Sequence, residues 1–264
     1  MRSRIAHLSS QSVRYLEAGQ GRPLVLLHAF PLSAEQWLPQ MAQVPPGWRF
    51  IAPDLRGFGG ADPGPVPGGI TMESYAGDVL ELLLHLDIPT AVVAGLSMGG
   101  YVALALARRA PGRLAGLVLA DTRAAADTVE GRAARDRMLE ILERDGPGGV
   151  AREMLPKLTG ATSQRDQPDL HDAIRQVIVG NTVAGLAAAI TAMKERPDST
   201  ALLPTIACPT TIICGAEDAI TVPAESEAMA RAIPGARLAV LPRAGHLSNL
   251  ENAEAFTAAL VEGR

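Results

Sequence analysis

One serine in this chain lies in a segment typical of a catalytic nucleophile. Gly95-Leu96-Ser97-Met98-Gly99 follows a buried apolar run that ends at Ala94 and precedes a helical pattern over residues 98–109. In such a strand–turn–helix the serine is held in a strained backbone position, and small flanking residues let the strand and helix pack closely. The helix N-terminus beside Ser97 favours negative charge. The segment therefore predicts nucleophilic catalysis by Ser97, in preference to a serine that only caps a helix.

A serine hydroxyl is a weak nucleophile at neutral pH and needs a base. Among the five histidines, His246 follows the last apolar run, residues 237–241, on a loop expected at the same sheet edge as Ser97. We therefore assign His246 as the base. The remaining histidines are His7, His28, His85 and His171.

The carboxylate that orients the base is expected after the preceding apolar run. Gly215-Ala216-Glu217-Asp218 follows Cys214 and offers two carboxylates. We favour Asp218, because the chain turns away after it, and expect Glu217 to be solvated. The role of Asp218 would be to fix the tautomer of His246 and to stabilise its imidazolium form.

A tetrahedral intermediate needs N–H donors around its oxyanion. The first expected donor is the backbone N–H of Met98, which follows the nucleophile. The second is expected in His28-Ala29-Phe30-Pro31, after the apolar run 24–28, and Phe30 is the candidate because its N–H is free. The ring of Phe30 could also form a pocket wall, and His28 is expected to brace this loop.

The elements that must position these residues alternate between apolar runs and helical patterns, which is typical of a mostly parallel sheet. Nearly continuous apolar runs indicate strands covered on both faces. Strands are predicted at residues 24–28, 50–53, 91–95, 114–120, 210–214 and 237–241, and helices at 71–86, 98–109, 224–233 and 253–261. Residues 5–9 and 13–18 alternate more and are expected to form an antiparallel edge hairpin.

The region from 123 to 203 has only helical patterns, interrupted by glycine and proline. A helical insert between two strands of a parallel sheet indicates a cap over the edge where ligands bind. We therefore predict a core of residues 1–122 and 204–264 and a helical cap of residues 123–203. The predicted pocket residues are Phe30, Trp37, Met138, Leu142, Met154 and Leu158.

Taken together, these segments resemble the α/β-hydrolase superfamily, and most closely its small carboxylesterases and 3-oxoadipate enol-lactonases. The resemblance rests on the Ser97 segment, 28–31, 54–59, 215–218 and 245–251. It implies an α/β fold with a mostly parallel eight-stranded sheet, helices on both faces, and a helical cap inserted before the last two strands. It favours Asp218 as the acid and leaves Asp121, after the run 114–120, as the rival.

The sequence departs from the family pattern at one position. The usual glycine after the first histidine is Ala29, so the oxyanion loop is expected to be slightly re-set. Haloalkane dehalogenases and many epoxide hydrolases carry aspartate at the position of Ser97, which argues against both activities.

The resemblance and the residues together predict hydrolysis of carboxylic esters of small to medium, fairly apolar substrates through an acyl-enzyme on Ser97. Enol-lactone hydrolysis is the alternative, with perhydrolysis as a side activity. Hydrolysis of an enol-lactone, whose substrate is dicarboxylate-like, would need a cation in the pocket. The candidates are Arg123, Arg152, Lys157 and Lys194. A ligand-binding receptor of the same fold is the non-enzymatic alternative.

Composition narrows the remaining classes. The 264 residues are 47% hydrophobic with a formal net charge of −4, and no basic block suggests nucleic acid. No apolar stretch is long enough for a membrane span. Cys208 and Cys214 are not expected to pair with each other, and a reduced cytoplasmic setting is predicted. No metal or organic cofactor is expected, and the sequence carries no signal for a particular oligomeric state.

Overall fold

The computed structural model describes residues 1–9, 11–61, 63–64, 66 and 68–263. Within these residues the chain forms an eight-stranded sheet in the order β1-β2-β4-β3-β5-β6-β7-β8. The strands are β1 (Arg2–His7), β2 (Ser12–Gly19), β3 (Arg22–Leu27), β4 (Trp48–Pro53), β5 (Ala91–Leu96), β6 (Leu114–Ala120), β7 (Thr210–Gly215) and β8 (Arg237–Leu241). Only the β1–β2 and β2–β4 pairs are antiparallel. The predicted fold class, including the edge hairpin, is confirmed.

The central strands are buried along their whole length. Every residue of β5 and β7 is buried, and Leu24 to Leu27 of β3 have no exposed surface. Their apolar runs lack alternation because helices cover both faces of the sheet. Full burial of one such aliphatic side chain stabilises the fold by roughly 1.5–3 kcal/mol.

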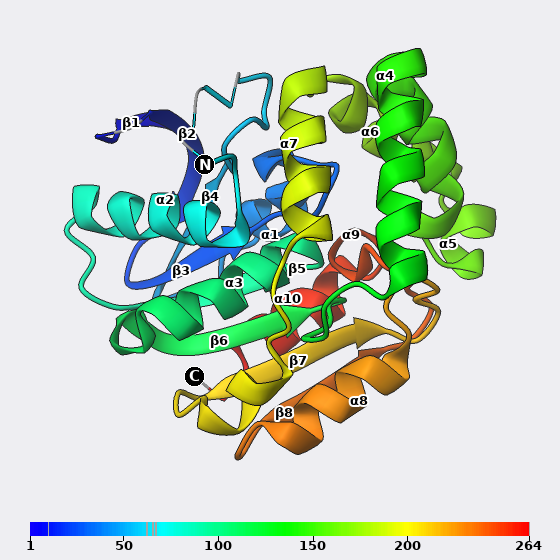
Figure 1. Cartoon of the computed structure of the whole chain (residues 1–264). Helices are drawn as coiled ribbons and strands as arrows, with labels where there is room; N and C mark the ends of the chain where they lie inside the picture. The colour runs from blue at the N-terminus through cyan, green and yellow to red at the C-terminus, as the bar shows by residue number, and fades with distance from the viewer. Residues whose placement is uncertain (10, 62, 65, 67, 264) are drawn as a thin grey trace.

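The two layers of helices flank this sheet. Figure 1 shows α2 (Met72–His85), α3 (Met98–Arg109) and α8 (Pro223–Ala232) in front of it, with α1 (Leu38–Ala42) and α10 (Ala253–Val261) behind. Short elements complete this part of the fold: η1 (Ala34–Trp37), η2 (Pro111–Arg113), η3 (Thr200–Thr205) and α9 (Ser248–Glu251). A capping box begins α2, where the Thr71 hydroxyl accepts from the N–H of Ser74 and the Ser74 hydroxyl accepts from the N–H of Thr71.

The segment between β6 and β7 is helical, as its sequence predicts. It contains α4 (Val129–Leu158), α5 (Ala161–Asp166), α6 (Pro168–Val179) and α7 (Val183–Lys194), which lie together above the sheet in Figure 1. Helix α4 is broken at Gly146, whose φ of 64° and ψ of −164° are not helical, and Pro147 follows. We call residues 121–209 the β6–β7 insert.

The β6–β7 insert is fastened to the loops at the sheet edge. One oxygen of Glu217 accepts the N–H of Thr162 at 2.8 Å. One oxygen of Glu251 accepts the N–H of Gly160 at 2.7 Å, and its other oxygen accepts the N–H of Leu247. Glu217, expected to be solvated, is partly exposed, and its carboxylate also accepts hydrogen bonds from Thr162 in the first turn of α5.

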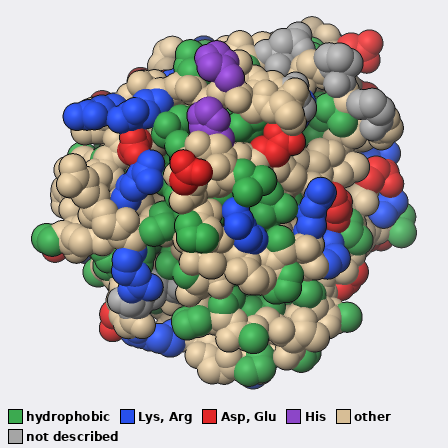
Figure 2. Space-filling model, turned by 90° about the vertical axis from the view of Figure 1, so that its left-hand side faces the viewer, with side chains coloured by type: hydrophobic (Ala, Val, Ile, Leu, Met, Phe, Trp, Pro, Cys, Tyr) green, Lys and Arg blue, Asp and Glu red, His purple; other side chains and the backbone are tan. Residues whose placement is uncertain are grey.

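The molecular surface near the β1 edge of the sheet carries charges of both signs. On the face that includes β1 and α2, Lys and Arg side chains lie interspersed with Asp and Glu side chains and with apolar patches (Figure 2). Cys208 and Cys214 are not joined by a disulfide, and Cys214 is fully buried in β7. In the described part of the chain, no single helix is long and apolar enough to cross a membrane, although α6 and α7, bent by 98°, pass as a pair by length and composition.

Candidate active site

Ser97 lies at the sharp turn between β5 and α3, with φ of 53° and ψ of −112°. A residue other than glycine in this region is strained, at a cost of about 1–3 kcal/mol. Two glycines make the turn possible. A Cβ at Gly95 would lie 2.1 Å from the carbonyl oxygen of Gly99, and a Cβ at Gly99 would lie 2.1 Å from that of Leu27. The glycine spacing around the serine is therefore a packing requirement.

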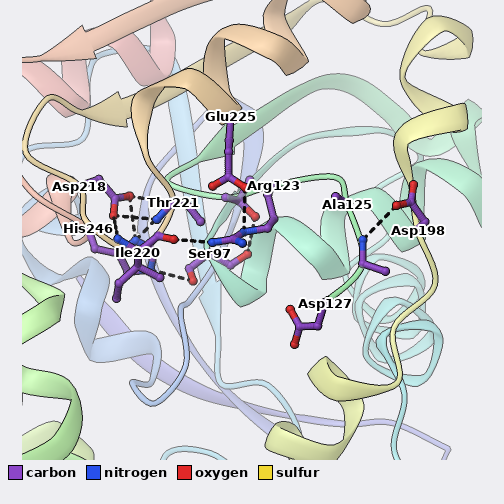
Figure 3. A network of polar contacts seen from close by, with 12 residues as sticks. Ser97, Arg123, Ala125, Asp127, Asp198, Asp218, Ile220, Thr221, Glu225 and His246 are labelled. Atoms are coloured by element: carbon purple, nitrogen blue, oxygen red, sulfur yellow. Dashed lines mark hydrogen bonds and ion pairs between the residues drawn. The ribbon is translucent and has the colours of Figure 1, made fainter. Parts of the chain in front are cut away.

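The structure brings the three residues predicted as a triad into one hydrogen-bonded chain (Figure 3). Oγ of Ser97 lies 2.9 Å from Nε2 of His246. On the other side of the ring, Nδ1 of His246 lies 2.9 Å from Oδ2 of Asp218. The side chains of His246 and Asp218 are almost entirely buried. The geometry is that required for a base that takes the hydroxyl proton and a carboxylate that orients it.

The carboxylate of Asp218 is held from several directions. Its Oδ1 accepts the backbone N–H groups of Ile220 and Thr221, at 2.8 and 3.0 Å, and its Oδ2 accepts the Thr221 hydroxyl at 2.6 Å. Burial opposes its ionisation, but the charge of His246 and these hydrogen bonds hold the pKa of Asp218 below its usual value. Asp218 is therefore an ionised, fixed acceptor for the Nδ1 proton.

The rival acid, Asp121, has different partners. It lies after β6, fully buried, and its carboxyl group accepts the N–H of Gly215 at 2.8 Å and a short hydrogen bond from the Ser248 hydroxyl. Burial, with the negative charge of Asp218, raises the pKa of Asp121 well above its usual value. The carboxylate that contacts His246 is thus Asp218.

The two predicted oxyanion donors lie at the ends of β5 and β3. Met98 is the first residue of α3, so its N–H has no partner within the helix. Phe30 follows β3, and the Phe30–Pro31 peptide bond is cis. Among the described residues, neither N–H donates a hydrogen bond to another part of the chain.

His28 braces the loop that carries Phe30. Its Nε2 accepts the N–H of Leu55 at 3.0 Å, and its Nδ1 lies 3.0 Å from the carbonyl oxygen of Ala29. Burial lowers the pKa of His28 to about 4, so the ring is neutral at pH 7 and its Nδ1–H donates to Ala29.

A cavity of about 220 Å³ opens beside Ser97 and His246. It is smaller than the ~300–1,000 Å³ usual for pockets of drug-sized ligands. The described residues around it are Phe30, Ser97, Tyr101, Arg123, Asp127, Gly131, Ala134, Arg135, Met138, Met154, Met193, Ile220 and His246. The core supplies the reacting groups, and the β6–β7 insert supplies most of the wall.

Three of the six predicted pocket residues border this cavity, namely Phe30, Met138 and Met154. The other three need correction, because they are core residues. Trp37 is fully buried against the ring of Phe256, with 5.8 Å between ring centroids. Leu142 and Leu158 are buried among other apolar side chains.

The charged residues of the lining are Arg123, Arg135 and Asp127. Among the four cations considered from the sequence, only Arg123 borders the cavity. The other three pair with carboxylates outside it: Arg152 with Asp145, Lys157 with Glu153 and Lys194 with Asp136.

Tyr101 and Arg135 were missed from the sequence. Tyr101 carried a usable signal, because it lies four residues after Ser97 and therefore on the same face of α3. No cluster of three or more His, Cys, Asp or Glu side chains that could hold a metal ion occurs in the described residues.

A sequence model described as the alpha/beta hydrolase fold matches residues 22–253. The chain belongs to the alpha/beta hydrolase fold family. Within this family it is similar to 3-oxoadipate enol-lactonase 2 of Acinetobacter baylyi, with 29% identity over 257 residues that cover 96% of this chain and 94% of that protein.

Solved structures of the family place the same fold over almost the whole chain. A thermophilic esterase from Thermogutta terrifontis, solved with malate bound, is 42% identical with a TM-score of 0.92, covering 99% of this chain and 97% of that one. The enol-lactonase from Burkholderia xenovorans LB400 is 30% identical with a TM-score of 0.89, covering 98% of each chain. Members of the alpha/beta hydrolase fold family that resemble this chain therefore include both ester and lactone hydrolases.

Proposed function

We propose that this protein is a serine hydrolase that cleaves carboxylic esters through an acyl-enzyme on Ser97. The observation that carries the proposal is the chain of hydrogen bonds from Ser97 through His246 to Asp218, with 2.9 Å at each step. The family and the esterase and enol-lactonase relatives support ester-cleaving chemistry.

In the first half-reaction, Oγ of Ser97 attacks the ester carbonyl while Nε2 of His246 takes its proton. The negative charge that develops on the carbonyl oxygen is stabilised by the N–H groups of Met98 and Phe30. Collapse of the tetrahedral intermediate breaks the C–O bond, and His246 returns the proton to the departing alcohol. Asp218 stabilises the imidazolium during this step and keeps its own charge.

In the second half-reaction, a water molecule replaces the alcohol. His246 takes a proton from the water, whose oxygen attacks the acyl carbon, and the proton then returns to Oγ of Ser97. The products are a carboxylic acid and the regenerated enzyme. The same steps open a lactone ring, except that acid and alcohol leave as one molecule.

The proposed substrates are small to medium esters with a short acyl chain. The cavity of about 220 Å³ and the methionines at 138, 154 and 193 support this size and an aliphatic environment. We also propose that residues 123–203 act as a cap over the site. We further propose that the protein is cytoplasmic. Cys214, which is buried in β7 and forms no disulfide, supports a reducing compartment.

Enol-lactone hydrolysis is the second candidate. It is supported by the two enol-lactonase relatives and by the presence of Arg123 at the cavity, where a cation was required. Perhydrolysis would need the same acyl-enzyme and hydrogen peroxide in place of water.

The test compares the wild type with Ser97→Ala on p-nitrophenyl acetate and butyrate. Turnover should vanish in the variant, while its circular dichroism and unfolding temperature stay close to those of the wild type. A fluorophosphonate should label the wild type stoichiometrically and leave Ser97→Ala unlabelled. Ester turnover that survives in the variant contradicts the proposal. Tight ligand binding without measurable turnover in the wild type would indicate a receptor instead.

A further inference from the structure

Two arginines, Arg123 and Arg135, and one aspartate, Asp127, border the cavity beside Ser97. Asp127 lies in the loop before α4 and pairs with two arginines: its Oδ2 lies 3.0 Å from Nε of Arg135, and its Oδ1 lies 2.7 Å from Nη1 of Arg196. Burial opposes ionisation of Asp127, but these two guanidinium groups hold its pKa below its usual value. One carboxylate thus serves two cations.

Arg196 is held by Asp127, by the ring of Tyr101 and by backbone carbonyl oxygens. Its side chain is 4% exposed, and it stacks 4.0 Å from the centroid of the Tyr101 ring. Its terminal nitrogens also donate to the carbonyl oxygens of Met193 and Ala125. Arg196 is therefore a buried structural cation to which Asp127 is committed.

Arg123 has a carboxylate of its own. Its Nε lies 3.3 Å from Oε1 of Glu225, and its Nη2 donates to the carbonyl oxygen of Ile220, in the loop that follows Asp218. Figure 3 shows this arginine in the same network of contacts as Ser97. The charge of Arg123 is therefore paired with Glu225, and its guanidinium is held in place by the carbonyl oxygen of Ile220.

Arg135 is left with donors to spare. It comes from the second turn of α4, borders the cavity, and has a side chain that is 24% exposed. Within the described residues, only its Nε has a hydrogen-bond partner, so both Nη groups are available. Arg123 and Arg196 each contact a carboxylate and backbone carbonyl oxygens, whereas Arg135 shares Asp127 with Arg196 and keeps two Nη groups without a partner among the described residues.

We propose that Arg135 binds a carboxylate of the substrate, so that the preferred substrates are esters of short dicarboxylic acids with one carboxyl group left free. This inference rests on the proposed function, because it places the bound carboxylate at the far end of the acyl chain carried by Ser97. The two Nη groups form the fork that pairs with a planar carboxylate.

The two free donors of Arg135 favour this class of anion. A planar carboxylate with one negative charge matches the two Nη groups of one guanidinium, whereas a dianionic phosphate would bring a second negative charge close to Asp127. The aliphatic wall of Met138, Met154 and Met193 suits the methylene groups between the two carboxyl carbons. The small volume of the cavity limits that spacer to a few methylenes.

The experiment uses substrates that differ only at the end of the acyl chain: methyl pentanoate and monomethyl glutarate, with the succinate and adipate half-esters as length variants. In the wild type, kcat/KM should be at least about tenfold higher for the best half-ester than for the neutral ester of equal length. Arg135→Gln should lower this ratio by about ten- to a hundredfold, mainly through KM for the half-ester.

The matched control is Arg152→Gln, on the same helix but outside the cavity, which should keep the wild-type ratio. If Arg135→Gln does not fold, two other measurements decide. Arg135→Lys keeps the charge but loses the fork, and its ratio should fall. In the wild type, glutarate should inhibit hydrolysis of methyl pentanoate competitively, whereas 1-pentanol at the same concentration should not.

The outcomes separate this inference from the proposed function. If Ser97-dependent hydrolysis of methyl pentanoate occurs but no half-ester is preferred, the carboxylate site is wrong and the hydrolase stands. If no ester is cleaved, the proposed function is wrong, and calorimetry decides the site. Glutarate should then bind Ser97→Ala at least about tenfold more tightly than Ser97→Ala/Arg135→Gln. Equal binding to the two variants overturns the inference.

Discussion

Asp121 and Asp218 follow neighbouring strands, yet only the carboxylate of Asp218 lies against the His246 ring, with Oδ2 2.9 Å from Nδ1. Asp121 instead accepts hydrogen bonds from Gly215 and Ser248, which precede Asp218 and follow His246 in the chain. One acid contacts the imidazole directly, and the other joins the two loops that hold the first acid and the imidazole.

The first prediction concerns Asp218→Asn. An amide cannot stabilise the imidazolium and favours the wrong tautomer of His246, so kcat should fall by about 10³–10⁴. Steady-state hydrolysis of p-nitrophenyl butyrate provides the measurement, with circular dichroism to check folding. A variant that keeps a tenth of the wild-type kcat would contradict the assignment of Asp218.

The second prediction concerns Asp121→Asn and stability. Burial and the charge of Asp218 raise the pKa of Asp121, so the folded state holds this proton more tightly than the unfolded state does. That contribution is present at low pH and is lost as the pH rises through the folded-state pKa. Asparagine does not titrate, so the variant should gain stability relative to the wild type between pH 5 and pH 8. Urea unfolding at both pH values measures it, and a constant difference argues against the raised pKa.

The third prediction concerns His28 in acid. Its pKa is lowered by burial from 6.5 to about 4, so the unfolded state binds the proton first as the pH falls. The wild type should lose up to roughly 3 kcal/mol of its unfolding free energy from this group between pH 6.5 and pH 4. His28→Gln removes the titration, and its stability should depend less steeply on pH. Parallel curves for the two proteins would show that His28 does not titrate this way.

The fourth prediction concerns two glycines. Gly99→Ala places a Cβ 2.1 Å from the Leu27 carbonyl oxygen, and it should destabilise the fold by at least about 1–3 kcal/mol through overpacking. Gly148→Ala, in α4, meets nothing within 4 Å and should stabilise by about 0.5–1 kcal/mol. Thermal unfolding compares them. Equal unfolding temperatures would indicate that the turn at Ser97 relaxes more readily than its geometry suggests.

The sheet and the chain order of Ser97, Asp218 and His246 could be read from the sequence because both follow from local patterns. Fully apolar runs specify buried parallel strands, and the carboxyl ends of such strands meet at one edge. The helix bounds also agree within one or two residues, for example Met98–Arg109 for the predicted 98–109.

The wall of the cavity could not be read in the same way. Whether Met138 or Leu142 faces the substrate depends on how α4 is rotated against α6 and α7. The break at Gly146 gives the second half of the helix, with Met154, a different rotation. Arg135 resembles any surface arginine in sequence. Its significance arises from Asp127, 8 residues before it, which the fold also pairs with Arg196, 61 residues after it.

The ties at Gly160 and Thr162 also bear on how this molecule could diversify. Loops of the core supply every reacting atom, whereas α4 and α7 form the part of the cavity wall that faces the acyl chain. A chimera that carries the corresponding helices of another family member should therefore have the acyl-chain specificity of that member. The chimera would have to keep the hydrogen bonds to Glu217 and Glu251. Without them the exchanged helices would be displaced relative to catalytic residues that are themselves unchanged.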